Sequence, residues 1–183
     1  LMISQEIREA HKRGIDRAFW IVEEMVSLEP RNIYGVSKLS AEHLCRMVHG
    51  ATNLPIIILR TSRFFPEEDD DAAARSLHSL DNAQANELLH RRADIEDVVQ
   101  AHLLAARHAP RIGFGRYIVS ATTPFARDDL QMLRENAAAV LRRLFPEAEA
   151  LYAKQGWTLP RQLDRVYVNE LARRDLGWQP RHD

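Results

Sequence analysis

Apolar residues recur every three or four positions in several stretches of this chain, the spacing that gives a helix one apolar side. The first stretch runs from residue 34 to about 48, and we expect it to stop at Gly50. Residues 94–108 follow the same pattern with Asp94 as the expected N-cap, and residues 128–143 follow it again. The pattern therefore predicts three long helices.

Short continuous apolar runs lie between these helices. Residues 56–59 are apolar and bounded by a proline and an arginine, which predicts a parallel strand buried on both faces. A second strand is predicted at 116–121. The remaining predictions are short helices at 4–13 and 168–176, a loop at 15–29, an irregular polar stretch at 61–92 and a further segment at 146–152.

Composition and charge narrow the class of protein. The 183 residues are 45% hydrophobic and 28% charged, which is typical of a globular domain. The net charge of -1 comes from interspersed acids and bases, so no basic footprint for nucleic acid is present. No apolar run approaches the roughly 20 residues that cross a bilayer. The single cysteine, Cys45, fits a reducing compartment, and we expect a cytoplasmic protein that binds neither nucleic acid nor membrane.

Tyr34 and Lys38 are the leading candidates for chemistry. Residues four apart share one face of a helix, so both side chains can reach the same site. A fixed ammonium favours the phenolate and lowers the pKa of a phenol, which would let Tyr34 exchange a proton with a substrate hydroxyl or carbonyl near neutral pH. Taken alone, the spacing also fits two polar residues at a helix start.

Four segments around this pair carry motifs in a characteristic order. They are Pro30-Arg31-Asn32-Ile33-Tyr34-Gly35-Val36-Ser37-Lys38-Leu39-Ser40-Ala41-Glu42, Leu54-Pro55-Ile56-Ile57-Ile58-Leu59-Arg60, Arg91-Arg92-Ala93-Asp94-Ile95-Glu96-Asp97-Val98-Val99-Gln100-Ala101 and Ala172-Arg173-Arg174-Asp175-Leu176-Gly177-Trp178-Gln179-Pro180. Together they resemble the extended short-chain dehydrogenase/reductases, the NAD-dependent epimerase/dehydratase family. The first segment resembles that family's active-site helix, the second its strand beside the nicotinamide, and the last its closing Leu-Gly-Trp-x-Pro signature.

The resemblance implies an α/β fold and a division of the chain. It would form the C-terminal part of a Rossmann-type doubly wound parallel sheet, with a smaller, mostly helical substrate subdomain. Residues 1–62 would belong to the NAD(P)-binding Rossmann domain and residues 63–183 to the substrate subdomain, with residues 94–121 returning to the Rossmann domain.

The resemblance also implies roles for individual residues in an oxidoreductase that binds NAD or NADP. Tyr34 would be the acid/base, and Lys38 would lower the pKa of Tyr34 and bind the nicotinamide ribose. Thr61 and Ser62 lie where the family's chain passes the nicotinamide amide, although a local strand-end cap explains them equally well.

The implied substrate is a small molecule, a sugar nucleotide or a related hydroxyl or carbonyl compound, handled by an epimerase, dehydratase or reductase. Arg63 can pair with a substrate phosphate or carboxylate, or with the acidic run that follows it. Arg92 lies near the family's substrate-contacting arginine and has a similar ambiguity.

One expected motif does not occur in the sequence. None of the seven glycines forms the family's phosphate-binding turn between a strand and a helix. The nearest approach, residues 113–115, leads into an apolar strand, whereas the motif should open a helix. Upstream of Tyr34 the only candidate hydroxyl near the start is Ser4. We therefore expect a truncated chain, the C-terminal part of a longer enzyme, with little turnover alone.

Metal binding is not expected. The eight histidines form no His-x-x-x-His pair and do not combine with acids at zinc-site spacing. The acidic run 67–71 lacks the alternating ligands and glycine bend of a calcium loop.

Three functions stay open on the sequence. The chain can be part of an active NAD(P)-dependent epimerase/dehydratase, or a non-catalytic binding or regulatory module derived from the same fold. It can also be an assembly element, because the helix at 34–48 resembles one that the family uses in a dimer-forming four-helix bundle. On that resemblance we expect a homodimer through this helix.

Overall fold

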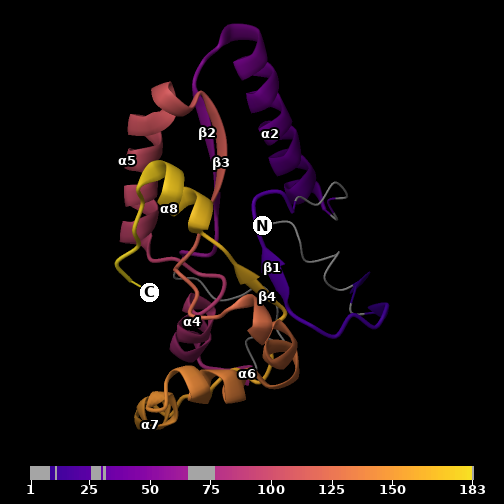
Figure 1. Ribbon diagram of the computed structural model, residues 1–183, viewed down its shortest axis with the longest axis vertical. Coiled ribbons are helices and arrows are strands. Elements are labelled where there is room, and N and C mark those ends of the chain that lie inside the picture. The colour runs from indigo at the N-terminus through magenta and orange to yellow at the C-terminus, as the bar shows by residue number, and fades with distance from the viewer. Residues whose placement is uncertain (1–8, 11, 26–29, 31, 66–76, 183) are drawn as a thin grey trace.

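The computed structural model describes residues 9–10, 12–25, 30, 32–65 and 77–182. Helices alternate with short parallel strands, as expected of an α/β fold (Figure 1). In chain order the elements are β1 (Phe19–Ile21), α2 (Ile33–Thr52), β2 (Ile56–Thr61), α4 (Leu80–Leu88), α5 (Ile95–Ile112), β3 (Phe114–Val119), the 3₁₀ helix η1 (Arg127–Asp129), α6 (Leu130–Leu144), α7 (Ala148–Lys154), β4 (Arg165–Tyr167) and α8 (Glu170–Leu176).

The strands of the described residues form two parallel pairs. β2 pairs with β3 in a register that runs from Ile56 opposite Phe114 to Thr61 opposite Val119. β1 pairs with β4, with Trp20 opposite Val166. Parallel neighbours need a crossover connection, and between β2 and β3 that crossover contains α4 and α5.

The main core lies on one face of the β2–β3 pair. α5 and α8 lie on that side of the strands, and α2 lies on the opposite side (Figure 1). Alternation along a strand sends successive side chains to opposite faces, so Tyr117 and Val119 point toward α5 while Ile118 points away. Trp178, just after α8, is fully buried in this core. The two helices on this face are therefore fixed by shared apolar packing.

A second core lies beneath the first and joins α6 to β4. Leu133 and Val140 of α6 pack with Val166 of β4 and with Phe125. A small cluster of Ile21, Ile118 and Tyr167 connects the two strand pairs.

The three long helices predicted from sequence are present, with different ends. α2 runs past Gly50 and ends at Thr52, because a single glycine inside a helix costs only about 1 kcal/mol relative to alanine. The residue that ends α2 is Asn53, which adopts a left-handed conformation (φ 57°) two residues before Pro55. α5 begins after Asp94 as predicted, and it extends beyond residue 108 to Ile112, with Gly113 as its C-cap. α6 is bent at Asn136, where the backbone leaves helical geometry.

Other elements were not predicted. β1 lies in the segment predicted as a loop, and α4 lies in the stretch predicted as irregular. β4 was also missed, because three residues are too few for a periodic pattern to be recognised. Two predictions lie outside the described part of the chain, wholly or in part: the acidic run 67–71, and residues 4–8 and 11 of the predicted helix 4–13.

The burial of β2 differs from the prediction of a strand buried on both faces. Its apolar residues are only partly buried, and Arg60 is its one buried residue. The reason is the asymmetry of its surroundings, because α5 packs closely on one face while α2 leaves much of the other open.

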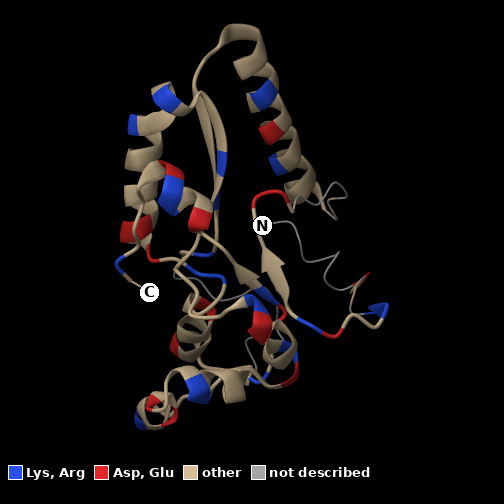
Figure 2. Cartoon of the chain, viewed as in Figure 1, with Lys and Arg blue, Asp and Glu red and all other residues tan. Residues whose placement is uncertain are grey.

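Charged residues of both signs are spread over the described part of the chain. Basic and acidic residues are interspersed over the elements (Figure 2). In the described part of the chain no helix is both long and apolar enough to cross a membrane.

Candidate functional site

The first turn of α2 is built around Asn32. This residue is extended (φ -143°), and its Oδ1 accepts a hydrogen bond from the Gly35 N–H at 2.8 Å. Such a cap satisfies one of the N–H groups that a helix start leaves unpaired. Tyr34 is thereby fixed in the first turn, and its carbonyl accepts a bond from the Ser37 hydroxyl at 2.8 Å.

Tyr34 and Lys38 lie side by side on this helix. The Lys38 Nζ atom is 5.3 Å from the centre of the Tyr34 ring, within the range of a cation–π contact. Both side chains are open to solvent, with Tyr34 63% exposed. The structure therefore brings together the two residues that the sequence singled out.

Thr61 and Ser62 follow one another at the carboxyl end of β2. Ligands of open α/β sheets bind beyond the carboxyl ends of the strands, so the position suits a binding site. The Ser62 side chain, however, is buried, and its hydroxyl donates to the Val119 carbonyl at 2.9 Å. Ser62 thus ties β2 to β3, while Thr61 is half-buried and belongs to the strand itself.

Arg63 and Arg92 also lie together, joined by a single parallel bridge between their backbones. Both guanidinium groups face the buried carboxylate of Glu87, at 3.7 Å from Arg63 Nε and 2.8 Å from Arg92 Nη1. Arg91 contacts the other Glu87 oxygen at 2.7 Å. Arg92 is buried, and its second amino group donates to the Phe65 carbonyl. Sequence reasoning did not foresee Glu87; its spacing of four and five residues from two arginines was the available signal.

A second unforeseen group joins α2 to β2. Arg60 donates from Nε and Nη2 to the two carboxylate oxygens of Glu42, at 2.8 and 2.7 Å. The remaining amino group of Arg60 donates to the Glu23 carbonyl at 2.7 Å. Glu42 was visible in the sequence as the last residue of the helix motif, but its partner could be found only by folding the chain.

The carboxylates around Arg60 have shifted pKa values. Burial works to raise the pKa of Glu42, but the hydrogen bond and charge of Arg60, followed by the charge of Arg116, hold it below its usual value. Burial raises the pKa of Glu23, against the hydrogen bond that its carboxylate accepts from the Ile118 N–H at 2.8 Å. The first carboxylate therefore carries its charge to lower pH than the second.

An open pocket of about 410 Å³ lies beside this ion pair, between α2 and β3. It is lined by Glu24, Leu39, Glu42, His43, Arg46, Phe114 and Arg116. Tyr34 and Lys38 are not among the lining residues, so the pocket is separate from the predicted acid/base pair.

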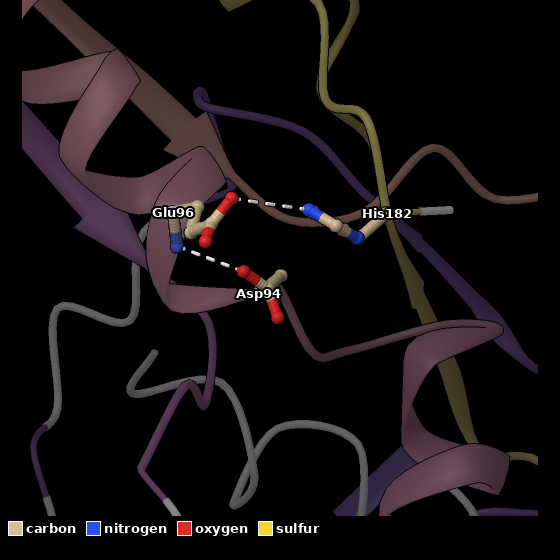
Figure 3. Close-up of side chains that lie close together, drawn as sticks. All are labelled: Asp94, Glu96 and His182. Carbon is tan, nitrogen blue, oxygen red and sulfur yellow. Dashed lines mark hydrogen bonds and ion pairs between the residues drawn. The ribbon is translucent and has the colours of Figure 1, made fainter.

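Asp94, Glu96 and His182 bring three possible metal-binding side chains close together (Figure 3). Asp94 Oδ1 accepts the Glu96 N–H at 2.8 Å as the N-cap of α5, and His182 Nε2 lies 3.5 Å from Glu96 Oε2. The position of His182 is set by Asp97, whose carboxylate accepts the N–H groups of Arg181 and His182. Helix capping and an ion pair account for this arrangement, and the expectation of no metal site stays a prediction.

Comparisons with known proteins agree on one family and one fold. The family model described as "NAD dependent epimerase/dehydratase family" matches residues 19–119, more than half of the chain. Among solved structures, the chain is similar to a UDP-N-acetylglucosamine 4-epimerase from Bacillus cereus, with 14% identity and a TM-score of 0.52. It is also similar to a UDP-glucuronic acid 4-epimerase from the same organism, solved in complex with NAD, with 17% identity and a TM-score of 0.52. No curated protein matches the chain.

The two structural matches cover the proteins unequally. Each covers 89% of this chain, but only 52% and 50% of the respective epimerases. The chain therefore spans about half the length of the solved structures that it matches. At these identities the likeness establishes a common fold, the Rossmann-type α/β fold of these epimerases.

Proposed function

The chain belongs to the NAD-dependent epimerase/dehydratase family, and from its Tyr34–Lys38 pair we propose that it supplies the acid/base half of an active site that acts on a sugar nucleotide. The observation that carries this proposal is the 5.3 Å contact between the Lys38 ammonium and the Tyr34 ring at the open start of α2. The reaction class is an epimerisation, dehydration or reduction at a carbon that bears oxygen.

Tyr34 moves the proton in this proposal. As a phenolate, Tyr34 takes the proton from a substrate hydroxyl; as a phenol, it returns the proton to a carbonyl. Lys38 is near enough for its positive charge to stabilise the phenolate that forms when Tyr34 gives up its proton. The exposure of both side chains leaves room for a substrate to reach them.

The residues present fit the nicotinamide-ribose end of a dinucleotide of the NAD or NADP type, while the phosphate-binding turn does not occur in the sequence. Lys38 offers an ammonium with three donors to the ribose hydroxyls, and Tyr34 lies beside it. Thr61 and Ser62 lie at the carboxyl end of β2, where the fold places ligands. Of the two hydroxyls, that of Ser62 is already donated to Val119, so Thr61 is the better candidate for a cofactor contact. When bound, such a cofactor supplies the hydride acceptor or donor.

The proposed substrate class rests on structural likeness and on one charged position. The similar solved structures include a UDP-glucuronic acid 4-epimerase in complex with UDP-glucuronic acid and NAD. Arg63 follows the carboxyl end of β2, and its guanidinium has the planar donors that suit a phosphate. Arg92 is the weaker candidate, because its donors are directed to Glu87 and Phe65 inside the protein.

A second function, assembly through α2, is favoured by a separate observation. The large apolar side chains of Ile33, Leu44 and Met47 are exposed along this helix. Such exposure is common at interaction surfaces. We propose that α2 forms the contact of a homodimer.

We also propose that the protein works in the cytoplasm, in keeping with a free cysteine at position 45.

Calorimetric titration with NAD+ and NADH tests the catalytic proposal. Because the phosphate-binding turn does not occur in the sequence, we expect weak binding by these 183 residues. Micromolar binding that Lys38→Ala weakens about tenfold or more, and that Tyr34→Phe changes little, would show a usable cofactor pocket in this chain. Any conversion of UDP-glucuronic acid or UDP-N-acetylglucosamine, followed by proton NMR of the sugar ring, is expected to be slow in this chain alone and to fall by about 10²–10⁴-fold in Tyr34→Phe.

The matched control is Lys154→Ala, an exposed lysine on α7 far along the chain from α2. It should leave both binding and turnover unchanged. A folded protein that binds neither nucleotide would reject the enzyme and favour the non-catalytic module.

A further inference from the structure

An ion pair two helical turns from Tyr34 joins α2 to the sheet. Among the described residues no hydrogen bond or ion pair joins the first two turns of α2 to a strand. The first such link is the two-point bond between Glu42 and Arg60, at 2.7 and 2.8 Å. Both side chains are largely withdrawn from solvent, at 15% and 7% exposure.

The position of this ion pair connects the two halves of the predicted site. Glu42 lies four residues beyond Lys38 and eight beyond Tyr34, along one slowly turning stripe of α2. Arg60 immediately precedes Thr61, the candidate cofactor contact at the end of β2. Arg60 is held in turn by the Glu23 carbonyl, so its guanidinium has little freedom to follow a moving helix.

Apolar packing does not provide an alternative anchor near this point. Only Gly35 of α2 is buried, and the open pocket of about 410 Å³ lies directly beside Glu42. Further along, the rings of His49 and Phe114 approach to 5.4 Å at the far end of the helix. Without the ion pair, α2 would be attached to the sheet mainly at the end remote from Tyr34.

We propose that Glu42 and Arg60 are positioning residues that fix the angle of α2, and with it the place of Tyr34 and Lys38 relative to the end of β2. This inference rests on the proposed function for its catalytic consequence. With a rise of about 1.5 Å per residue, Tyr34 lies about 12 Å along the axis from Glu42. A tilt of about 5° at that distance moves Tyr34 by about 1 Å, and a misplacement of that size is enough to slow a reaction about 10²-fold.

The two-point bond from Arg60 suits this role better than the single, longer contact of Arg116 Nη1 with Glu42 at 3.6 Å. A guanidinium that meets both oxygens of a carboxylate fixes direction as well as distance, which an ammonium cannot do. Arg60→Lys retains the charge and loses the second bond, while Glu42→Gln retains the shape and loses the charge. Glu24→Gln is the matched control, because Glu24 lines the same pocket and is exposed.

The first test measures the helix position directly. Spin labels at Ile33, the exposed first residue of α2, and at Leu103, exposed on α5, report their separation by pulsed electron resonance in a Cys45→Ala background. Glu42→Gln and Arg60→Lys should shift or broaden the distance distribution, and Glu24→Gln should not. An unchanged distribution in both ion-pair variants overturns the proposal whether or not the protein is active.

The second test compares each variant with the low turnover of UDP-glucuronic acid and NAD+ expected of the wild-type chain, in protein that circular dichroism shows to be folded. We expect kcat to fall about 10²-fold in Glu42→Gln and less in Glu42→Asp, with KM changed by no more than about threefold. An unaltered kcat, or a loss confined to KM, contradicts the positioning role. A wild-type protein that neither binds NAD+ nor turns over would refute the proposed function, while the label distances would still decide what fixes α2.

Discussion

The two longest helices, α2 and α5, lie on opposite sides of the same strand pair and are held there by different forces. α5 buries Asp97, Val98, Ala101 and Ala105 against the strands and α8, whereas α2 buries only Gly35. Each begins with a side-chain cap, Asp94 or Asn32, so the difference does not lie in how the helices start. The difference lies in the side chains that each helix buries against the sheet.

The same strand pair therefore supports a packed helix, α5, on one face and the helix of the candidate site, α2, on the other. α5 is held mainly by apolar burial, which is a non-directional force. The Trp178 indole N–H also donates a hydrogen bond to the Asp97 carbonyl at 2.9 Å. α2 depends on directed polar contacts, above all the bond from Arg60 to Glu42. A helix attached in this way leaves Tyr34 and Lys38 exposed, so that the substrate of the proposed proton transfer can reach them.

Removing the anchor of α5 should have the largest effect on stability. Trp178→Ala deletes a fully buried side chain, and such truncations cost about 3–5 kcal/mol. We expect urea unfolding, followed by circular dichroism, to show a loss of this size. Trp157→Ala is the control, since Trp157 is only half-buried and should cost clearly less. Equal losses would mean that the α5 core is not the dominant one.

Acid should affect the region between α4 and β4, where His90 lies, at a different pH from the attachment of α2. Burial, followed by the charge of Arg91, lowers the pKa of His90 to about 3, outweighing the nearby Asp164. Because the unfolded imidazole titrates near 6.5, the unfolded state binds more protons in this window. The contribution of His90 is therefore complete above pH 6.5 and is lost as the pH falls toward 3.

Glu42 behaves differently, because its pKa is already below the unfolded value of about 4.3. Its contribution is present above that pH and is lost only as the pH falls through its lower folded pKa. We expect global stability to decline from pH 6.5 downward while hydrogen exchange in α2 changes only below about pH 4. His90→Gln should flatten the decline, and the exposed His43→Gln should not. A decline that is unaltered in His90→Gln would contradict the assignment.

The sequence predicted the parts of this comparison that depend on local pattern. The periodic apolar residues gave α5 and α2, and Asp94 marked the start of α5. The family motifs placed Tyr34 and Lys38 on one helix, and the structure brings them together. Their catalytic roles, like the domain boundary near residue 63, stay predictions.

What the sequence could not predict depends on contacts between distant residues. Glu42 and Arg60 are 18 residues apart, and nothing in either segment identifies the other as its partner. Glu87 lies in a helix too weakly amphipathic to be recognised, yet it collects the two arginines expected to meet a substrate. β1 and β4 are each three residues long and acquire their identity only by pairing.

The smallest effect on stability should come from the open side of α2. Leu44 is largely exposed, so Leu44→Gln removes little packing within the chain, and surface changes of this kind usually stay within about 0.5 kcal/mol. Leu104→Gln on α5 is the matched control, because Leu104 packs against the main core and should cost more. Unfolding is measured at low protein concentration, and sedimentation velocity at high concentration. If α2 forms the proposed homodimer contact, Leu44→Gln should weaken association without weakening the fold. A dimer unaffected by Leu44→Gln would mean that the dimer contact lies elsewhere. The exposure of α2 would then be explained only by access to the Tyr34–Lys38 pair.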